Sequence, residues 1–223
     1  MSSIGTARIP KMKPASASAL LAIGLLLAAC GTAPEPTATA PSVPLVGNYP
    51  APAAEKSGRA AVQHGYDPGA ASLDRTPQKI TVEQLVSMRR KVGDDIELSN
   101  FPDKRVAPFE TSTYQIDATI KSIKHEKDGD FYCVIQGDSG AQAVVEVPDP
   151  RVCKDSPMLP DIEKAREALY NKFHPTDTNR AVNEKATITG VGYLGTRKRK
   201  GSGTFSATAR LMPGTGVTFP AGQ

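Results

Sequence analysis

Four carboxylates near two predicted turns are the first residues in this sequence that could do chemistry. Asp128 and Asp130 flank a glycine, and Glu146 and Asp149 follow in the next predicted strand and turn. Their oxygens could ligate a cation or work as an acid–base pair. However, Asp-Gly-Asp is more often a tight turn with solvated carboxylates. We therefore predict no metal site and no cofactor here.

The other reactive residue types do not complete a catalytic set. The chain has 3 histidines, and His64, His125 and His174 fall in a proline-rich stretch, a turn and a helix end. The sequence contains no nucleophile elbow, no HExxH pair and no phosphate-binding loop. We predict a protein that is not an enzyme. A metal-dependent hydrolase with an unrecognised set of acids stays open as an alternative.

Cys30 is a thiol at the end of a leader-like segment. Arg8, Lys11 and Lys13 give a positive start, and residues 19–29 are apolar. This apolar stretch is far shorter than the ~20 residues that span a bilayer, so it is typical of a signal peptide.

The tetrapeptide Leu27-Ala28-Ala29-Cys30 resembles the lipobox of bacterial lipoproteins. The resemblance implies that residues 1–29 are removed and that Cys30 carries diacylglycerol. The protein would then be anchored by lipid to a membrane of the cell envelope. Gly31, in place of an aspartate, favours the outer membrane if the host is Gram-negative. An ordinary signal peptide followed by a chance cysteine is the alternative.

Two further cysteines, Cys133 and Cys153, remain once Cys30 is lipidated. An even number of thiols in an oxidising compartment favours a disulfide. Such a bridge would contribute roughly 3 kcal/mol to stability. A zinc site is disfavoured because two cysteines without paired histidines supply too few ligands.

A basic tetrapeptide, Arg197-Lys198-Arg199-Lys200, lies in a glycine-rich turn with Tyr193 and Phe205 near it. Cations beside stacking rings could bind nucleic acid or another polyanion. The net charge of +4 does not support nucleic-acid binding. Loss of residues 1–29 lowers the number of basic residues from 27 to 24 against 23 acidic ones, so the remaining chain is close to neutral. We favour a solvated hairpin tip whose charges deter aggregation, and we keep polyanion binding as the alternative.

The N-terminal half of the chain is expected to hold little structure. Residues 30–76 are rich in Pro, Ala and Thr, which predicts a disordered tether with His64 and Tyr66 in solvent. Residues 77–112 form a lead-in with one short helix, opened by a capping box of Thr81 and Gln84. An extended segment is expected at residues 96–101.

Residues 113–219 carry the patterns of a folded domain. Apolar and polar residues alternate at 113–120, and Asp128-Gly129 marks the hairpin to the next strand. A helix with one apolar face is expected between the third and fourth strands. The predicted elements are strands at 113–120, 131–136, 141–147, 185–194 and 204–211, and the helix at 161–173.

This order of three strands, a helix and two strands resembles the OB-fold, a five-stranded β-barrel. The stretches Asp128-Gly129-Asp130-Phe131 and Glu146-Val147-Pro148-Asp149-Pro150, with Cys153, are also similar to a domain of uncharacterised exported bacterial proteins. We therefore expect a mainly β, non-catalytic module that binds a protein or an envelope polymer. A five-stranded sheet of another topology is the structural alternative.

Overall fold

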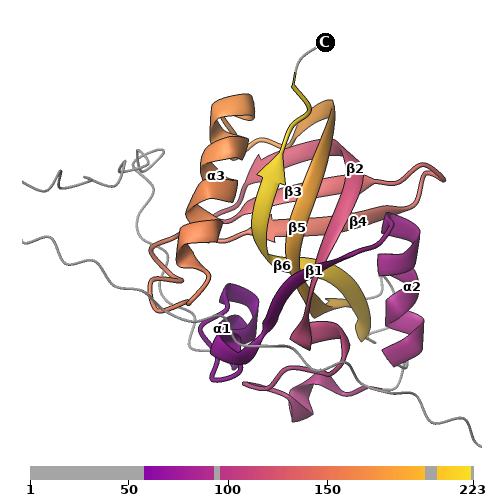
Figure 1. Ribbon diagram of the computed structural model, residues 1–223, viewed down its shortest axis with the longest axis vertical. Helices are drawn as coiled ribbons and strands as arrows, with labels where there is room; N and C mark the ends of the chain where they lie inside the picture. The colour runs from indigo at the N-terminus through magenta and orange to yellow at the C-terminus, as the bar shows by residue number, and fades with distance from the viewer. Residues whose placement is uncertain (1–57, 93–95, 199–204, 222–223) are drawn as a thin grey trace, which may run out of the picture. The chain divides into compact units, whose positions relative to one another are not determined.

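The described part of the chain is mainly β, with a sheet of six strands and three α-helices (Figure 1). It comes from a computed structural model that describes residues 58–92, 96–198 and 205–221. The elements are α1 (Gly58–His64), β1 (Asp74–Lys79), α2 (Val82–Val92), β2 (Ser112–His125), β3 (Phe131–Gln136), β4 (Gln142–Val147), α3 (Leu159–Phe173), β5 (Arg180–Lys198) and β6 (Phe205–Thr218). Three short 3-10 turns are η1 (Ala70–Ser72), η2 (Leu98–Asn100) and η3 (Phe109–Thr111).

The strand pairings close into a ring. The order is β1-β2-β3-β4-β6-β5, and β2 pairs with β5 as well as with β3. The β4–β6 pair is parallel and joins Val145 to Leu211, whereas the other pairs within the ring are antiparallel. β1 lies outside the ring and runs parallel to the start of β2. The ring therefore joins strands that are far apart in the sequence.

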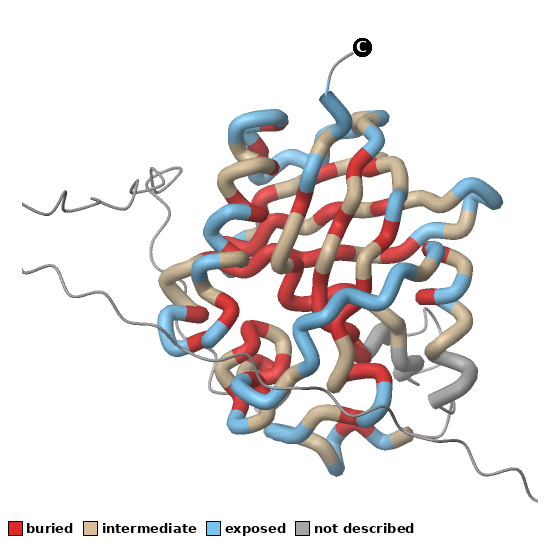
Figure 2. Tube along the Cα trace, in the orientation of Figure 1, coloured by how far each residue is buried: buried red, intermediate tan, exposed pale blue. Residues whose placement is uncertain are grey.

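The core joins residues of the strands to residues of α2 and α3, and burial alternates along strands such as β3 (Figure 2). In β3, Phe131, Cys133 and Ile135 are buried while the residues between them are not. Because successive side chains point to opposite faces of a strand, one face of β3 reaches the core. This confirms the strand predicted at 131–136, and the strand predicted at 141–147 is found one residue shorter.

α3 covers one side of the sheet, where the predicted helix was expected (Figure 1). Its buried residues include Ile162, Leu169 and Phe173, which recur at helical spacing. The capping box of α2 is also confirmed: the Thr81 amide donates to Gln84 Oε1 at 2.8 Å, and the Gln84 amide donates to Thr81 Oγ1 at 3.2 Å.

The predicted tether of residues 30–76 extends too far. Residues 58–76 contain α1, η1 and the first part of β1, and His64 is 7% exposed instead of solvated. The Arg59 guanidinium holds α1 to the sheet by pairing with the buried carboxylate of Glu110. Glu110 also accepts hydrogen bonds from the amides of Val106 and Leu194, both at 2.7 Å. The composition of this stretch is typical of disorder. Composition cannot show contacts with residues far along the chain, such as the one between Arg59 and Glu110.

Other predicted bounds also differ from the structure. The segment at 96–101 contains the 3-10 turn η2 instead of an extended strand. β2, β5 and β6 are all longer than predicted, and β2 continues to His125 because Ile123 and His125 still pair with β3. β1 was not predicted, because its sequence shows no alternation of apolar and polar residues. In the structure its six residues are all exposed (Figure 2).

Candidate functional site

The structure describes the first two of the four basic residues that were kept as an alternative polyanion site. Arg197 and Lys198 end β5, where they pair with Ser206 and Phe205 of β6. Arg199 and Lys200 lie outside the described residues, as does Cys30. Tyr193 is only 7% exposed, and the Arg59 guanidinium lies 5.1 Å from its ring centre. Its ring is thus part of the packing of α1 and is not presented for stacking.

The predicted disulfide between Cys133 and Cys153 is not formed, and both residues are buried free thiols. Cys133 faces the core from β3, where it pairs with Ile123 and Val145. Cys153 lies in the turn after β4 and donates a hydrogen bond to the Asp149 carbonyl at 3.3 Å. Burial raises the pKa of each thiol to about 12. The even number of cysteines suggested a disulfide. In the structure, however, Cys133 packs in the core and Cys153 donates to the Asp149 carbonyl.

A pocket of about 360 Å³ opens where β2, β5 and the end of β6 meet. Its volume falls at the lower end of the range for small-ligand sites, roughly 300–1,000 Å³. It is lined by Asp117, Ala118, Thr119, Asp138, Lys185, Ala186, Thr187, Thr218, Phe219 and Pro220.

A second pocket, of about 270 Å³, adjoins the first, and Asp117 and Asp138 line both. It is lined by Lys79, Ile80, Thr81, Val82, Glu83, Gln84, Asp117, Gly137 and Asp138. We call the two together the Asp117 groove. The groove thus runs from the start of α2, past β2, to the end of β6, and it combines polar side chains with the ring of Phe219.

Asp117 is fixed where the two pockets meet. Its Oδ1 accepts a hydrogen bond from Thr187 Oγ1 at 2.6 Å, and its Oδ2 lies 2.9 Å from Lys79 Nζ. The hydrogen bond from Thr187 and the contact with Lys79 hold the pKa of this carboxyl below its usual range. The side chain is still 56% exposed. Asp117 is therefore an oriented carboxylate that can accept further hydrogen bonds from a ligand.

The Phe219 ring, which lines the larger pocket, is supported by α3. Phe219 meets the Phe173 ring edge to face, with centres 5.5 Å apart, and Lys172 Nζ lies 5.4 Å from the centre of the Phe219 ring. Ala118 and Ala186 pack into the core, so their side chains point away from Asp117 and Thr187. Phe219 is therefore the aromatic side chain of the pocket lining that α3 holds in place.

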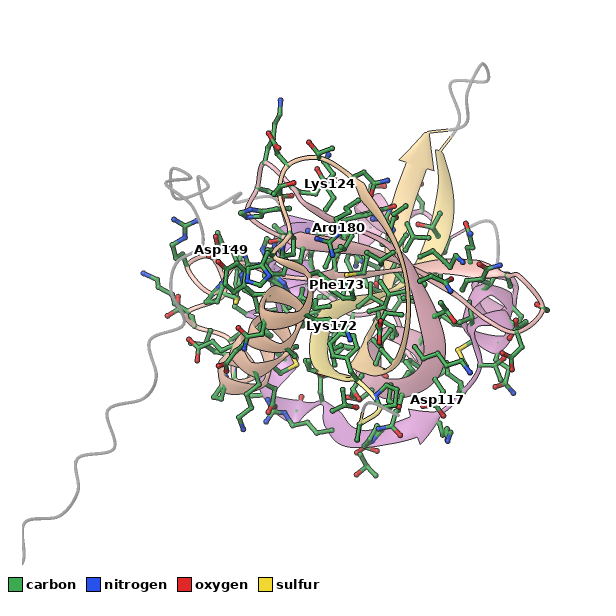
Figure 3. The ribbon with its side chains drawn as sticks, turned by 90° about the horizontal axis from the view of Figure 1, so that it is seen from above. Asp117, Lys124, Asp149, Lys172, Phe173 and Arg180 are labelled. Atoms are coloured by element: carbon green, nitrogen blue, oxygen red, sulfur yellow. The ribbon has the colours of Figure 1, made fainter. Side chains whose placement is uncertain are left out.

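The acidic residues singled out from the sequence form a different cluster, on the opposite side of the fold from Asp117 (Asp149 and Asp117 in Figure 3). Asp130 is fully buried and its Oδ1 accepts a hydrogen bond from the Asp149 amide at 3.0 Å. Arg151 donates two hydrogen bonds of 3.0 Å to the Asp149 carboxylate through Nε. Although burial works in the opposite direction, the hydrogen bonds from Arg151 lower the pKa of Asp149.

Arg166 completes this cluster from α3. Its guanidinium donates to the carbonyls of Gly129, Val147 and Pro148, and it lies 3.8 Å from the centre of the Phe131 ring. These contacts join the β2–β3 turn to the end of β4. Within the described residues, no group of three or more His, Cys, Asp or Glu side chains is placed to hold a metal ion. We interpret this acidic cluster as a set of contacts that hold the β2–β3 turn against the end of β4.

No family model, curated protein or solved structure matches this chain. The helices in the described ranges also include none with the length and apolarity to cross a membrane.

Sequence reasoning missed the groove because its residues look like ordinary surface positions. Asp117 and Thr187 are polar residues that alternate with buried ones in their strands, which indicates only that they face outward. They face each other because Asp117 pairs with Thr187 across β2 and β5. That register joins residues 70 positions apart, and no local pattern specifies it.

Proposed function

We propose that this chain is a lipid-anchored cell-envelope protein whose folded module is an OB-like barrel that binds a protein or an envelope polymer without catalysis. The ring of strands with α3 between β4 and β5 supports the OB-like assignment. The leader and Cys30 support the lipid anchor.

The Asp117 groove is the observation that carries the binding function. It offers an oriented carboxylate, threonine hydroxyls and the Phe219 ring in one concave surface. A few fixed polar groups beside apolar surface are typical of sites that bind ligands. The buried acidic cluster is a weaker candidate because most of its polar atoms already contact protein groups.

The anchor is tested by metabolic labelling of the full chain with palmitate. We expect label in the wild-type protein and none in Cys30→Ser, which should also leave the membrane fraction. An unlabelled wild-type protein would contradict the anchor without affecting the binding function.

The binding function is tested by co-sedimentation of the full chain with an insoluble envelope polymer stripped of protein, and by affinity for a detergent extract of envelope proteins. We expect Asp117→Ala to weaken binding to one of the two at least tenfold. The matched control is Asp161→Ala, which removes a half-exposed carboxylate that lies outside the groove and, like Asp117, contacts a cation. Equal binding by both variants would rule out the groove as the site.

A further inference from the structure

The outer face of β2, β5 and β6 in the Asp117 groove carries polar side chains in rows across the strands. Asp117 of β2 lies opposite Thr187 of β5, which lies opposite Thr218 of β6. In the next row along β2, Thr119 lies opposite Lys185. All five residues line the larger pocket. Because neighbouring strands lie about 4.8 Å apart, these rows offer hydrogen-bonding groups at short and regular intervals.

The apolar residues of the same strands point the other way. Ile116, Ile188 and Val217 each precede or follow one of the polar residues and are buried in the core. Since successive side chains alternate between the two faces of a strand, the rows consist of polar side chains only. They therefore lack the apolar centre that is typical of a protein–protein interface.

The charges of the groove disfavour an anionic ligand. Its lining residues carry three carboxylates, on Glu83, Asp117 and Asp138, and two ammonium groups, on Lys79 and Lys185. One of the ammonium groups, that of Lys79, already contacts Asp117 Oδ2 at 2.9 Å. Nucleic acid and other polymers rich in phosphate or carboxylate would thus meet more negative than positive charge.

Hydroxyl groups suit this mixture of side chains because a hydroxyl both donates and accepts hydrogen bonds. Asp117 is oriented by Thr187 at 2.6 Å and is still 56% exposed, so its carboxylate can accept from ligand hydroxyls. The hydroxyls of Thr119 and Thr218 can donate or accept. A sugar ring also has apolar C–H groups, for which Phe219 supplies an aromatic surface in the larger pocket.

The form of the groove fits a chain of repeating units. The pockets of about 360 Å³ and about 270 Å³ adjoin at Asp117 and Asp138. Neighbouring units of one polymer can occupy the two pockets together, whereas a small compact molecule would occupy only one of them.

We infer that the Asp117 groove binds an uncharged polysaccharide of the envelope, whose hydroxyl groups form hydrogen bonds with Asp117 and the threonines around it. This inference rests on the proposed function and names the class of polymer. Asp117 accepts hydrogen bonds from the sugar hydroxyls, and Thr187 is the residue that positions Asp117.

The test uses envelope polysaccharide freed of protein and separated by anion exchange into an uncharged and an anionic fraction. Each fraction is immobilised through its reducing ends, and binding of the full chain is measured by surface plasmon resonance. We expect at least tenfold tighter binding to the uncharged fraction. Since few counterions are released, the affinity should change less than twofold between about 50 and 200 mM salt. O-methylation, which removes the hydroxyl donors of the polysaccharide, should weaken binding at least tenfold.

Variants of the groove test the roles of the two residues. Asp117→Asn removes one acceptor oxygen and should weaken binding to the uncharged fraction at least tenfold. Thr187→Val removes the hydroxyl that orients Asp117 and should weaken it at least fivefold, whereas Thr187→Ser keeps this hydroxyl and should bind like the wild type. The matched control is Thr178→Val, because Thr178 is exposed and lies outside the groove.

The outcomes separate this inference from the proposed function. Tighter binding to the anionic fraction, undiminished binding after O-methylation, or binding to neither fraction would overturn the inference. If the anionic fraction or the protein extract then binds in a manner that depends on Asp117, the proposed function stands with a different ligand. If no binding depends on Asp117, both fall.

Discussion

The Nε2 atom of His64 lies 3.5 Å from the Oδ2 atom of Asp130, and the two side chains are 9% and 1% exposed. His64 ends α1, whereas Asp130 lies in the turn between β2 and β3. Oδ2 accepts no hydrogen bond from a described residue. The imidazole is therefore the group that compensates this buried oxygen, and it holds α1 against the ring.

Removal of this imidazole should destabilise the protein. We expect His64→Ala to lower the free energy of unfolding by about 3 kcal/mol, because it leaves a buried carboxylate without compensation. Urea denaturation measures the change. His174→Asn is the control, since His174 is exposed and asparagine tolerates its left-handed backbone, with φ at 48°. Equal losses in the two variants would show that the contact with Asp130 has no special role.

Glu110 should be equally important for the attachment of α1. Glu110→Gln keeps the shape but removes the charge that faces Arg59, and one of its oxygens becomes an amide donor that cannot accept hydrogen bonds. We expect a loss on the order of 3 kcal/mol in the free energy of unfolding. Hydrogen exchange should also show faster exchange of the α1 amides. Glu163→Gln, on the exposed face of α3, should change neither measurement.

The turn between β2 and β3 should require glycine at position 129. Gly129 has φ at 94°, and a Cβ atom there would lie 2.5 Å from Asp149 Oδ2 and 2.9 Å from Asp149 Cβ. We expect Gly129→Ala to cost on the order of 3 kcal/mol in thermal or urea unfolding.

Gly140→Ala separates backbone strain from this collision. Gly140 has φ at 86°, but its nearest neighbour would be Gln136 Nε2 at 3.4 Å. It should therefore cost only about 1 kcal/mol. Similar losses in the two variants would contradict the close packing of Asp149 on the turn.

Glu146 should make stability depend on pH. Burial raises the pKa of its carboxyl to about 7 from 4.5, despite its contact with Arg210 at 2.5 Å. The folded state therefore binds the proton more tightly than the unfolded chain does. Its contribution to stability is fully present below pH 4.5 and is lost as the pH rises to about 7.

The measurement compares wild-type protein and Glu146→Gln by urea unfolding across this pH range. The wild type should lose about 3 kcal/mol relative to the variant between the two ends of the range. Glu163→Gln serves as the control and should follow the wild type. Parallel curves for the wild type and Glu146→Gln would contradict the raised pKa.

The two buried thiols should react only after unfolding. In Cys30→Ser, burial and the raised pKa of Cys133 and Cys153 keep the thiolate scarce in the folded state. We expect iodoacetamide to modify neither cysteine in native protein and both in urea without reductant, as read by mass spectrometry. Modification of neither in urea would restore the predicted disulfide.

Local patterns in the sequence predicted the elements that depend on neighbouring residues. Three such patterns are the alternation of β3, the apolar face of α3 and the Thr81–Gln84 capping box. In each of them, the residues that make the pattern are close to one another in the sequence. The hairpin at Asp128-Gly129 is likewise a local signal, and Gly129 has the positive φ that such a turn requires.

Features that depend on distant partners were missed or wrong. Arg59 and His64 look like solvated residues in a proline-rich stretch, yet the partners of Arg59 lie 42 or more positions away and His64 contacts Asp130 of the β2–β3 turn. The Asp117 groove depends on the register of β2 against β5, which joins residues 70 positions apart. The disulfide was inferred from a count of thiols, and such a count contains no information on their geometry.

The parallel contact between Val145 and Leu211 has a consequence for the order of folding. β6 lies between β4 and β5 in the sheet although it follows both of them in the chain. A chain that lacks β6 leaves one edge of β4 and one edge of β5 unpaired. The ring of strands therefore closes only when the last strand, which ends at Thr218, joins it.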